Sequence, residues 1–173
     1  MALHHRHGVQ SSAAIAGHPL HHMLIPFPIA FLIGAFGTDL AFRSTQNPFW
    51  AQASYWHLVA GIVTALVAAL PGFMDFFTMS GVRDLGIAWT HMIGNLVVVV
   101  IAAVNAWLRW NDPVAGLQGW GLTLSGLMAL LLFVNGWLGG ELAYRYGLGA
   151  IQDDSPEVER FHRPETGTSV RHH

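Results

Sequence analysis

Two uninterrupted apolar runs decide the fold, Leu96-Val97-Val98-Val99-Val100-Ile101 and Leu127-Met128-Ala129-Leu130-Leu131-Leu132-Phe133-Val134. The competing interpretation is a soluble four-helix bundle, whose helices would carry a polar stripe on the face turned to water. Both runs are apolar on every helical face. They therefore predict helices that lie within a lipid bilayer.

Four apolar stretches of the chain, two of which contain these runs, each approach the roughly 20 residues that cross a bilayer. Only 10% of the 173 residues are charged and 53% are hydrophobic, whereas a soluble domain is roughly 25% charged. We therefore expect an all-α integral membrane protein, a transmembrane four-helix bundle with both termini on the same side. Pro71 and Gly72 predict a break near the end of the second span. The expected spans are residues 24–42, 55–74, 85–107 and 117–140.

The two ends of the chain differ in composition from the spans. Residues 1–20 form a polar leader without the apolar run of a cleaved signal peptide, and residues 151–173 form a charged tail that we expect to be disordered. The transmembrane domain lies between them, over residues 21–150. Of the 11 histidines, six require no special role, because they lie in the polar ends away from the spans: His4, His5, His7, His162, His172 and His173.

Orientation follows from the arginines, since the chain contains no lysine. Four crossings place both termini on one face, called side A, and the connections 43–54 and 109–116 on the other, side B. The positive-inside rule makes side A cytoplasmic, because more arginines lie there. Those of side A are Arg6, Arg83, Arg145, Arg160, Arg163 and Arg171, and those of side B are Arg43 and Arg109.

Composition and motifs exclude several functions. The absence of cysteine excludes disulfides, thiolate metal sites and a cysteine nucleophile. A net charge of −2 without clustered cations argues against a nucleic-acid partner. The chain has no Gly-x-Ser-x-Gly elbow, no His-Glu-x-x-His motif and no Gly-rich phosphate loop. We therefore do not expect a stand-alone enzyme.

Ionisable residues inside a membrane are costly and by default indicate function. At side A, His21 and His91 stand at comparable depth on different helices, and neutral imidazole is the commonest protein ligand of transition metals. They predict a haem b or transition-metal site (iron, manganese or zinc) for membrane electron transfer, with His18 as a further ligand. The expected supporting or alternate ligands are Asp75, Asn95 and Glu141.

The alternative is that these side A residues only pair with one another or cap helices. The protein would then be a non-catalytic structural or accessory subunit whose polar cluster fixes helix packing. A third hypothesis, proton or ion permeation, is disfavoured because span three offers only apolar side chains between Asn95 and Asn105.

At side B the sequence predicts a second, smaller polar group. Asp39 and His57 are the expected pair, because a carboxylate–imidazole hydrogen bond would satisfy both groups. Such a pair would be a structural lock between spans one and two, or half of a proton path. Arg43 belongs to the same side B layer, and Asn105 and Arg109 could join it.

Four motifs occur in order along the spans. They are His18-Pro19-Leu20-His21 with Ile25-Pro26-Phe27-Pro28-Ile29, then Ala69-Leu70-Pro71-Gly72-Phe73-Met74-Asp75, then His91-Met92-Ile93-Gly94-Asn95, and finally Gly136-Trp137-Leu138-Gly139-Gly140-Glu141-Leu142-Ala143-Tyr144. Together they resemble the bacterial membrane family catalogued as domain of unknown function 2231. The resemblance covers about residues 18–150, with Ala143 as a departure where a larger aliphatic residue is expected.

The resemblance implies a multi-pass protein of the bacterial inner membrane and supplies no established activity. Some relatives occur beside or fused to Rieske-type iron–sulfur domains, which implies electron transfer and a redox partner protein such as a Rieske-type protein. The lipid bilayer is the expected environment. The sequence leaves a homo-oligomer open.

Overall fold

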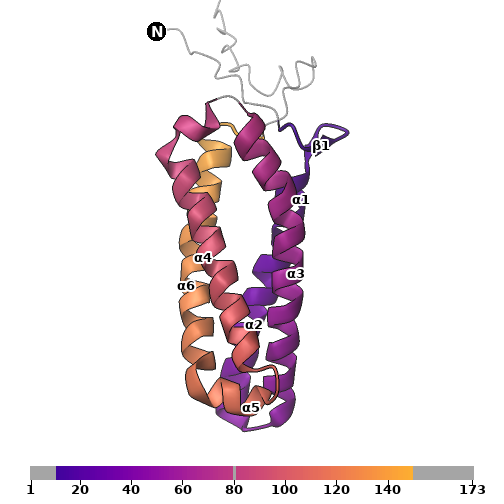
Figure 1. Ribbon diagram of the computed structural model, residues 1–173, viewed down its shortest axis with the longest axis vertical. Helices are drawn as coiled ribbons and strands as arrows, with labels where there is room; N and C mark the ends of the chain where they lie inside the picture. The colour runs from indigo at the N-terminus through magenta and orange to yellow at the C-terminus, as the bar shows by residue number, and fades with distance from the viewer. Residues whose placement is uncertain (1–10, 80, 150–173) are drawn as a thin grey trace, which may run out of the picture.

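The computed structural model describes residues 11–79 and 81–149, and four long helical segments run side by side along its length (Figure 1). In chain order the elements are β1 (Ala14–Ile15), β2 (His18–Pro19), α1 (Leu20–Leu24), α2 (Pro26–Thr45), α3 (Pro48–Thr78), the 3-10 helix η1 (Val82–Asp84), α4 (Gly86–Leu108), α5 (Pro113–Gly116), the π-helical turn η2 (Leu117–Gly121) and α6 (Leu122–Tyr144).

The four expected crossings are confirmed as helices long and apolar enough to span a membrane. They extend over Leu20–Thr45, Pro48–Thr78, Gly86–Leu108 and Pro113–Tyr144. Three of them are longer than predicted, because hydropathy excludes the polar residues with which a helix continues into the headgroup region. The structure thus shows a multi-pass, all-α membrane protein.

The start of α3 is set by local capping. The Asn47 side chain accepts a hydrogen bond from the backbone N–H of Phe49 at 3.0 Å, and Pro48 occupies the first turn, where its missing N–H costs nothing. The predicted break at Pro71 and Gly72 is wrong, since α3 continues through both residues to Thr78. Packing of the bundle around this segment outweighs the lost backbone hydrogen bond.

The bundle consists of two helical hairpins. α2 packs against α3 and α4 packs against α6; the hairpins meet where α2 contacts α6 and α3 contacts α4. α2 and α4 therefore lie diagonally across the bundle, with α4 in front and α2 behind in Figure 1. Any site between α2 and α4 lies on the axis of the bundle.

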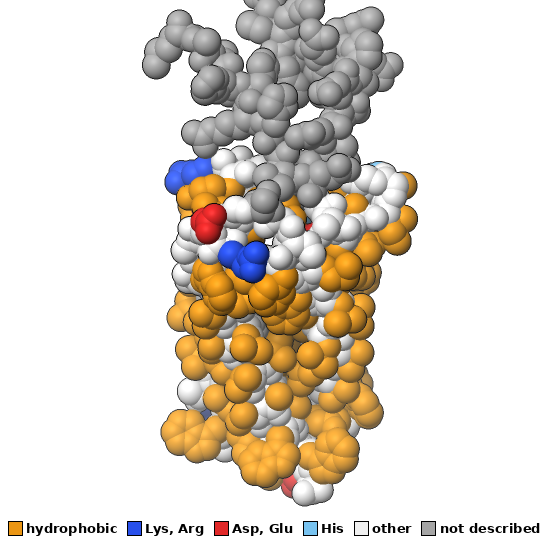
Figure 2. Space-filling view, turned by 45° about the horizontal axis from the view of Figure 1, so that its top comes forward, with side chains coloured by type: hydrophobic (Ala, Val, Ile, Leu, Met, Phe, Trp, Pro, Cys, Tyr) orange, Lys and Arg blue, Asp and Glu red, His pale blue; other side chains and the backbone are white. Residues whose placement is uncertain are grey.

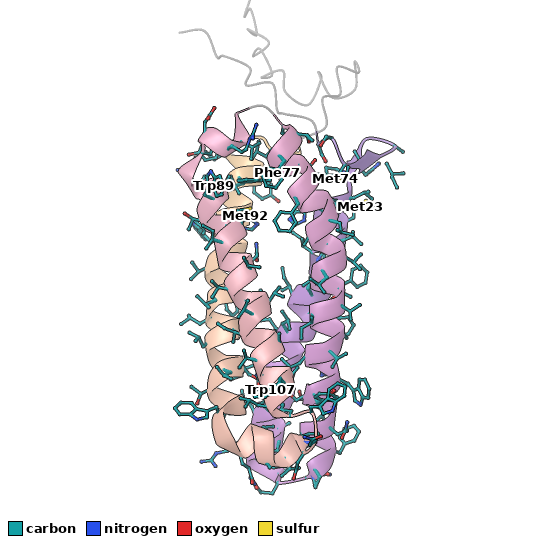
Figure 3. The ribbon with its side chains drawn as sticks, in the orientation of Figure 1. Met23, Met74, Phe77, Trp89, Met92 and Trp107 are labelled. Carbon is teal, nitrogen blue, oxygen red and sulfur yellow. The ribbon has the colours of Figure 1, made fainter. Side chains whose placement is uncertain are left out.

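The centre of the bundle is apolar, and so is its outer surface. The core contains Leu32, Leu58, Val98 and Met128, each almost completely buried. Large apolar side chains also cover the outside, while charged side chains gather at the end where the described residues begin and end (Figure 2). Trp89 and Trp107 mark the two ends of α4 (Figure 3). This distribution suits a protein whose outer solvent is lipid.

The described chain begins and ends at the same end of the bundle, side A (Figure 1). Residues 11–13 lie against the end of α3, where Asp75 accepts hydrogen bonds from the Ser11 hydroxyl at 2.7 Å and from the Ala13 backbone N–H at 3.1 Å. The β1–β2 hairpin then leads into α1. The expected charged tail, residues 151–173, lies outside the described residues.

Candidate functional site

Polar side chains inside the bundle form two layers. The histidine layer, toward side A, contains His21 on α1, His91 and Asn95 on α4, and the backbone carbonyls of Ala68 and Asn135. The ion-pair layer, toward side B, contains Asp39, Ser54, Asn105, Arg109 and Ser125. The apolar core separates the two layers.

His21 is oriented by the backbone of α3. Its Nδ1 lies 2.8 Å from the carbonyl oxygen of Ala68. A carbonyl oxygen only accepts hydrogen bonds, so Nδ1 carries the proton and Nε2 carries the lone pair. Within the described chain, Nε2 of His21 has no hydrogen-bond partner, and the side chain is only partly buried.

His91 is oriented in the same way by α6. Its Nδ1 lies 3.1 Å from the carbonyl oxygen of Asn135, which makes Nδ1 the donor. The side-chain amide of Asn95, one turn further along α4, donates to Nε2 at 3.1 Å and to the backbone carbonyl of His91 at 3.0 Å. Both contacts place the lone pair of His91 on Nε2.

A glycine on the neighbouring helix makes room for each imidazole. A Cβ built on Gly72 would lie 2.8 Å from Nδ1 of His21, and one built on Gly139 would lie 2.9 Å from Cε1 of His91. No side chain fits at either position without moving the ring. The Pro-Gly and Gly-Gly motifs of α3 and α6 therefore provide the surfaces on which the two rings rest.

The other side A residues singled out from the sequence lie elsewhere. His18 is exposed on β2, with Nδ1 against the carbonyl of Ala16 at 2.9 Å. Asp75 holds the segment 11–13. Glu141 pairs with Arg145 at 2.9 Å and lines a groove of about 820 Å³ between α2 and α6 on the outer surface. Over residues 11–79 and 81–149, no group of three or more histidines, aspartates and glutamates could hold a metal ion.

The ion-pair layer is built around Arg109. Its guanidinium donates to both carboxylate oxygens of Asp39, at 2.7 and 2.8 Å, and both side chains are completely buried. The remaining donors go to Asn105 Oδ1 at 2.9 Å, Ser54 Oγ at 2.8 Å and Ser125 Oγ at 3.2 Å. All five guanidinium N–H groups are thus satisfied, by side chains from all four long helices.

The predicted pair of Asp39 and His57 is wrong. Both oxygens of Asp39 bind Arg109, because a guanidinium offers two parallel N–H groups where an imidazole offers one. His57 lies against Gly34 of α2 and beside Phe31, and its Nδ1 is buried without a hydrogen-bond partner in the described chain. The lock at side B therefore joins α2 to α4 rather than α2 to α3.

Sequence reasoning missed Ser54 and Ser125, and it named Arg109 only as a residue that could join the side B group, without identifying it as the partner of Asp39. Small hydroxyl residues in an apolar helix give no signal of their own. Arg109, however, directly follows an apolar span in a chain with eight cationic residues, and such a charge is expected to turn inward toward a partner.

Comparison with known proteins gives a family and no closer relative. No curated protein and no solved structure matches the chain. A family model described as "Predicted membrane protein (DUF2231)" matches residues 17–152. This range covers every helix of both hairpins and both polar layers. The chain therefore belongs to this family of membrane proteins, catalogued as domain of unknown function 2231.

Proposed function

We propose that this membrane protein holds a haem b between His21 and His91 and uses it for electron transfer in the bilayer. The observation that carries the proposal is the shared orientation of the two imidazoles, each with Nδ1 bound to a backbone carbonyl. This arrangement directs the lone pair to Nε2, as is usual for ligating histidines. The two rings come from diagonal corners of the bundle.

The ligand set favours haem over a single metal ion. A transition-metal ion usually takes three or more protein ligands, and no such group occurs among the residues that the structure describes. A porphyrin supplies four nitrogens itself, so two imidazoles suffice. On ligation, Asn95 would lose its contact with Nε2 of His91 but keep its bond to the carbonyl of His91.

When bound, a haem supplies a centre that cycles between ferrous and ferric iron. The protein side of that function is performed by its own residues. Ala68 and Asn135 carbonyls fix the tautomers, Gly72 and Gly139 set the ring positions, and the apolar core excludes water beneath the rings. A redox partner, such as a Rieske-type protein, would exchange electrons with this layer from side A, the nearer face.

The test is an absorption spectrum. The protein is purified in mild detergent from haem-replete cells and, if colourless, titrated with haemin. A low-spin spectrum of bis-imidazole type is expected, and His21→Ala and His91→Ala should each abolish it. His57→Ala is the matched control, since His57 is also a membrane-embedded histidine but lies outside the histidine layer. A protein that stays colourless after haemin titration rules the proposal out.

A non-catalytic accessory subunit is the second candidate. One observation favours it: His21 and His91 each join two helices by a hydrogen bond to a backbone carbonyl, of Ala68 and of Asn135, without any ligand. Under this hypothesis His21→Ala and His91→Ala lower thermal stability, and no haem or metal signal accompanies the parent protein. Metal analysis of the same preparation completes the comparison.

We also propose the bacterial inner membrane as the location, with side A cytoplasmic. Arg83 and Arg145 are exposed at side A, whereas Arg109 at side B is buried against Asp39 and presents no free charge. Only Arg43 then remains as an exposed arginine at side B among the described residues. Reporter fusions to the chain ends and to the connection after Thr45 would test the orientation.

A further inference from the structure

One spacing recurs in all four long helices. On each span, a residue that belongs to or contacts the histidine layer and one that belongs to or contacts the ion-pair layer are separated by 18 positions. The first and third spans carry the histidines and the ion pair. The second and fourth spans carry small residues that contact them. The pairs are His21 with Asp39, Ser54 with Gly72, His91 with Arg109, and Gly121 with Gly139.

Eighteen residues equal five turns of an α-helix, at 3.6 residues a turn, so both members of a pair lie on the same helix face. At 1.5 Å a residue they lie about 27 Å apart along the helix axis. α1 and α2 act as one helix here, since Ile25 between them keeps a helical conformation (φ −60°, ψ −25°). His21 and Asp39 therefore lie on the same face of the first span. His91 and Arg109 lie on the same face of the third.

The two hairpins repeat one another. In the first, His21 donates to the carbonyl of Ala68 and rests on Gly72, four residues later. In the second, His91 donates to the carbonyl of Asn135 and rests on Gly139, again four residues later. The two sets of contacts correspond when α2 is exchanged with α4 and α3 with α6. The same exchange matches Asp39 to Arg109, since each follows its histidine by 18 residues.

The ion pair is the direct tie between the two histidine-bearing helices. α2 and α4 are diagonal and lack an extended contact of their own. In the described part of the chain, the hydrogen bonds that join them are the two between Arg109 and Asp39. The guanidinium and the carboxylate meet through two parallel hydrogen bonds. This contact fixes the relative height of α2 and α4 along the bundle axis as well as the distance between them. Ser54 and Ser125 restrain the same guanidinium from α3 and α6.

We propose that Asp39 and Arg109 are positioning residues for the histidine layer. The pair keeps α2 and α4 level at side B, and because each span continues as helix from there to the histidine layer, it keeps His21 level with His91 at side A. The inference goes beyond haem binding, since the relative height of the two helices is a property of the protein alone. A pair that only stabilised the bundle would leave the heights at side A unchanged when its geometry is altered.

The test measures distances between spin labels, which the absence of native cysteine makes straightforward. Met23→Cys and Ile93→Cys report on side A, each two residues from one of the histidines and each more than half exposed; Met23 is labelled in Figure 3. Leu40→Cys and Val104→Cys report on side B. Distances are recorded by pulsed electron resonance on the haem-free protein in lipid nanodiscs.

Arg109→Lys is the informative substitution, because it keeps the charge and loses the two-point contact. We expect the Met23–Val104 and Ile93–Leu40 label distances to change in opposite directions by about 1 Å, because sliding one helix by about 1.5 Å, the rise of one residue, lengthens one diagonal and shortens the other. Arg43→Lys is the matched control, since Arg43 is exposed near the end of α2. Adding Asp39→Glu to Arg109→Lys lengthens the acidic side and should restore part of the parental distribution.

A change confined to the Leu40–Val104 distance overturns the proposal, and so do unchanged diagonal distances. Should Arg109→Lys fail to fold, Ser125→Ala removes one restraint on the guanidinium and predicts a smaller change in the same diagonal distances. The result is independent of the cofactor. A colourless protein whose diagonal distances change refutes haem binding and keeps this inference, and a haem protein whose diagonal distances stay unchanged does the reverse.

Discussion

The two polar layers of the bundle differ in completeness. In the ion-pair layer every donor of Arg109 and both oxygens of Asp39 are bonded, and all five side chains are fully buried. In the histidine layer the rings are only partly buried, and Nε2 of His21 has no hydrogen-bond partner in the described chain. A complete buried network holds structure and has nothing left to bind with. An oriented ring with a spare lone pair is what a binding site requires.

The largest effect should come from breaking the complete layer. Arg109→Ala leaves the carboxylate of Asp39 buried and unpaired, which costs about 3–5 kcal/mol of unfolding free energy. The double variant with Asp39→Ala should be less destabilised than Arg109→Ala, because no charge is then left alone. Unfolding in detergent, followed by circular dichroism, measures both. Equal stability of Arg109→Ala and the parent would contradict the structural role.

A smaller effect should follow from disturbing the histidine layer. Gly139→Ala places a methyl group 2.9 Å from Cε1 of His91, and such overpacking costs about 1–3 kcal/mol. Gly140→Ala is the control one residue later, where a methyl group meets nothing within 4 Å. It should gain up to about 1 kcal/mol, because alanine favours the helix over glycine. The melting temperatures of the two variants, compared with that of the parent protein, test this prediction. Similar changes in both melting temperatures would argue against the packing of His91 on Gly139.

The smallest effect should be at His57, which belongs to neither layer. Its buried Nδ1 lacks a hydrogen-bond partner in the described residues, so His57→Leu removes an unsatisfied polar atom. We expect a change between zero and about 1 kcal/mol in the stabilising direction. The same unfolding assay applies. A large loss of stability would show that the His57 side chain has a hydrogen-bond partner. His57 would then form a third polar site beside the two layers.

The fold could be predicted because lipid imposes a simple rule. A run such as residues 96–101 has no place for a polar face, so its helix must lie in a bilayer, and length then sets the number of crossings. The contact of Asn95 with His91 also follows from helical geometry, since residues four apart share a face. These inferences need only composition and the helical period.

The partners across the bundle could not be predicted in this way. Asp39 and His57 were paired because they lie at similar depth on consecutive spans, but the carboxylate binds Arg109, which is 70 residues away. The depth of a residue in the membrane follows from its position along the chain. The rotation of each helix about its axis, and the helices that it packs against, do not. The recurrence of 18 residues from His21 to Asp39 and from His91 to Arg109 was a signal that could have suggested the pair.

The sequence by itself determined a four-span membrane protein with histidines toward one face, because hydrophobic length and helical period are local properties of the chain. Tertiary structure decided that Arg109 binds Asp39 across the diagonal, that Gly72 and Gly139 support the two imidazoles, and that Asp75 binds the segment 11–13. The physical reason is that these contacts depend on how four helices rotate and pack together. Inside a bilayer that choice is governed by close packing and by the cost of an unpaired charge.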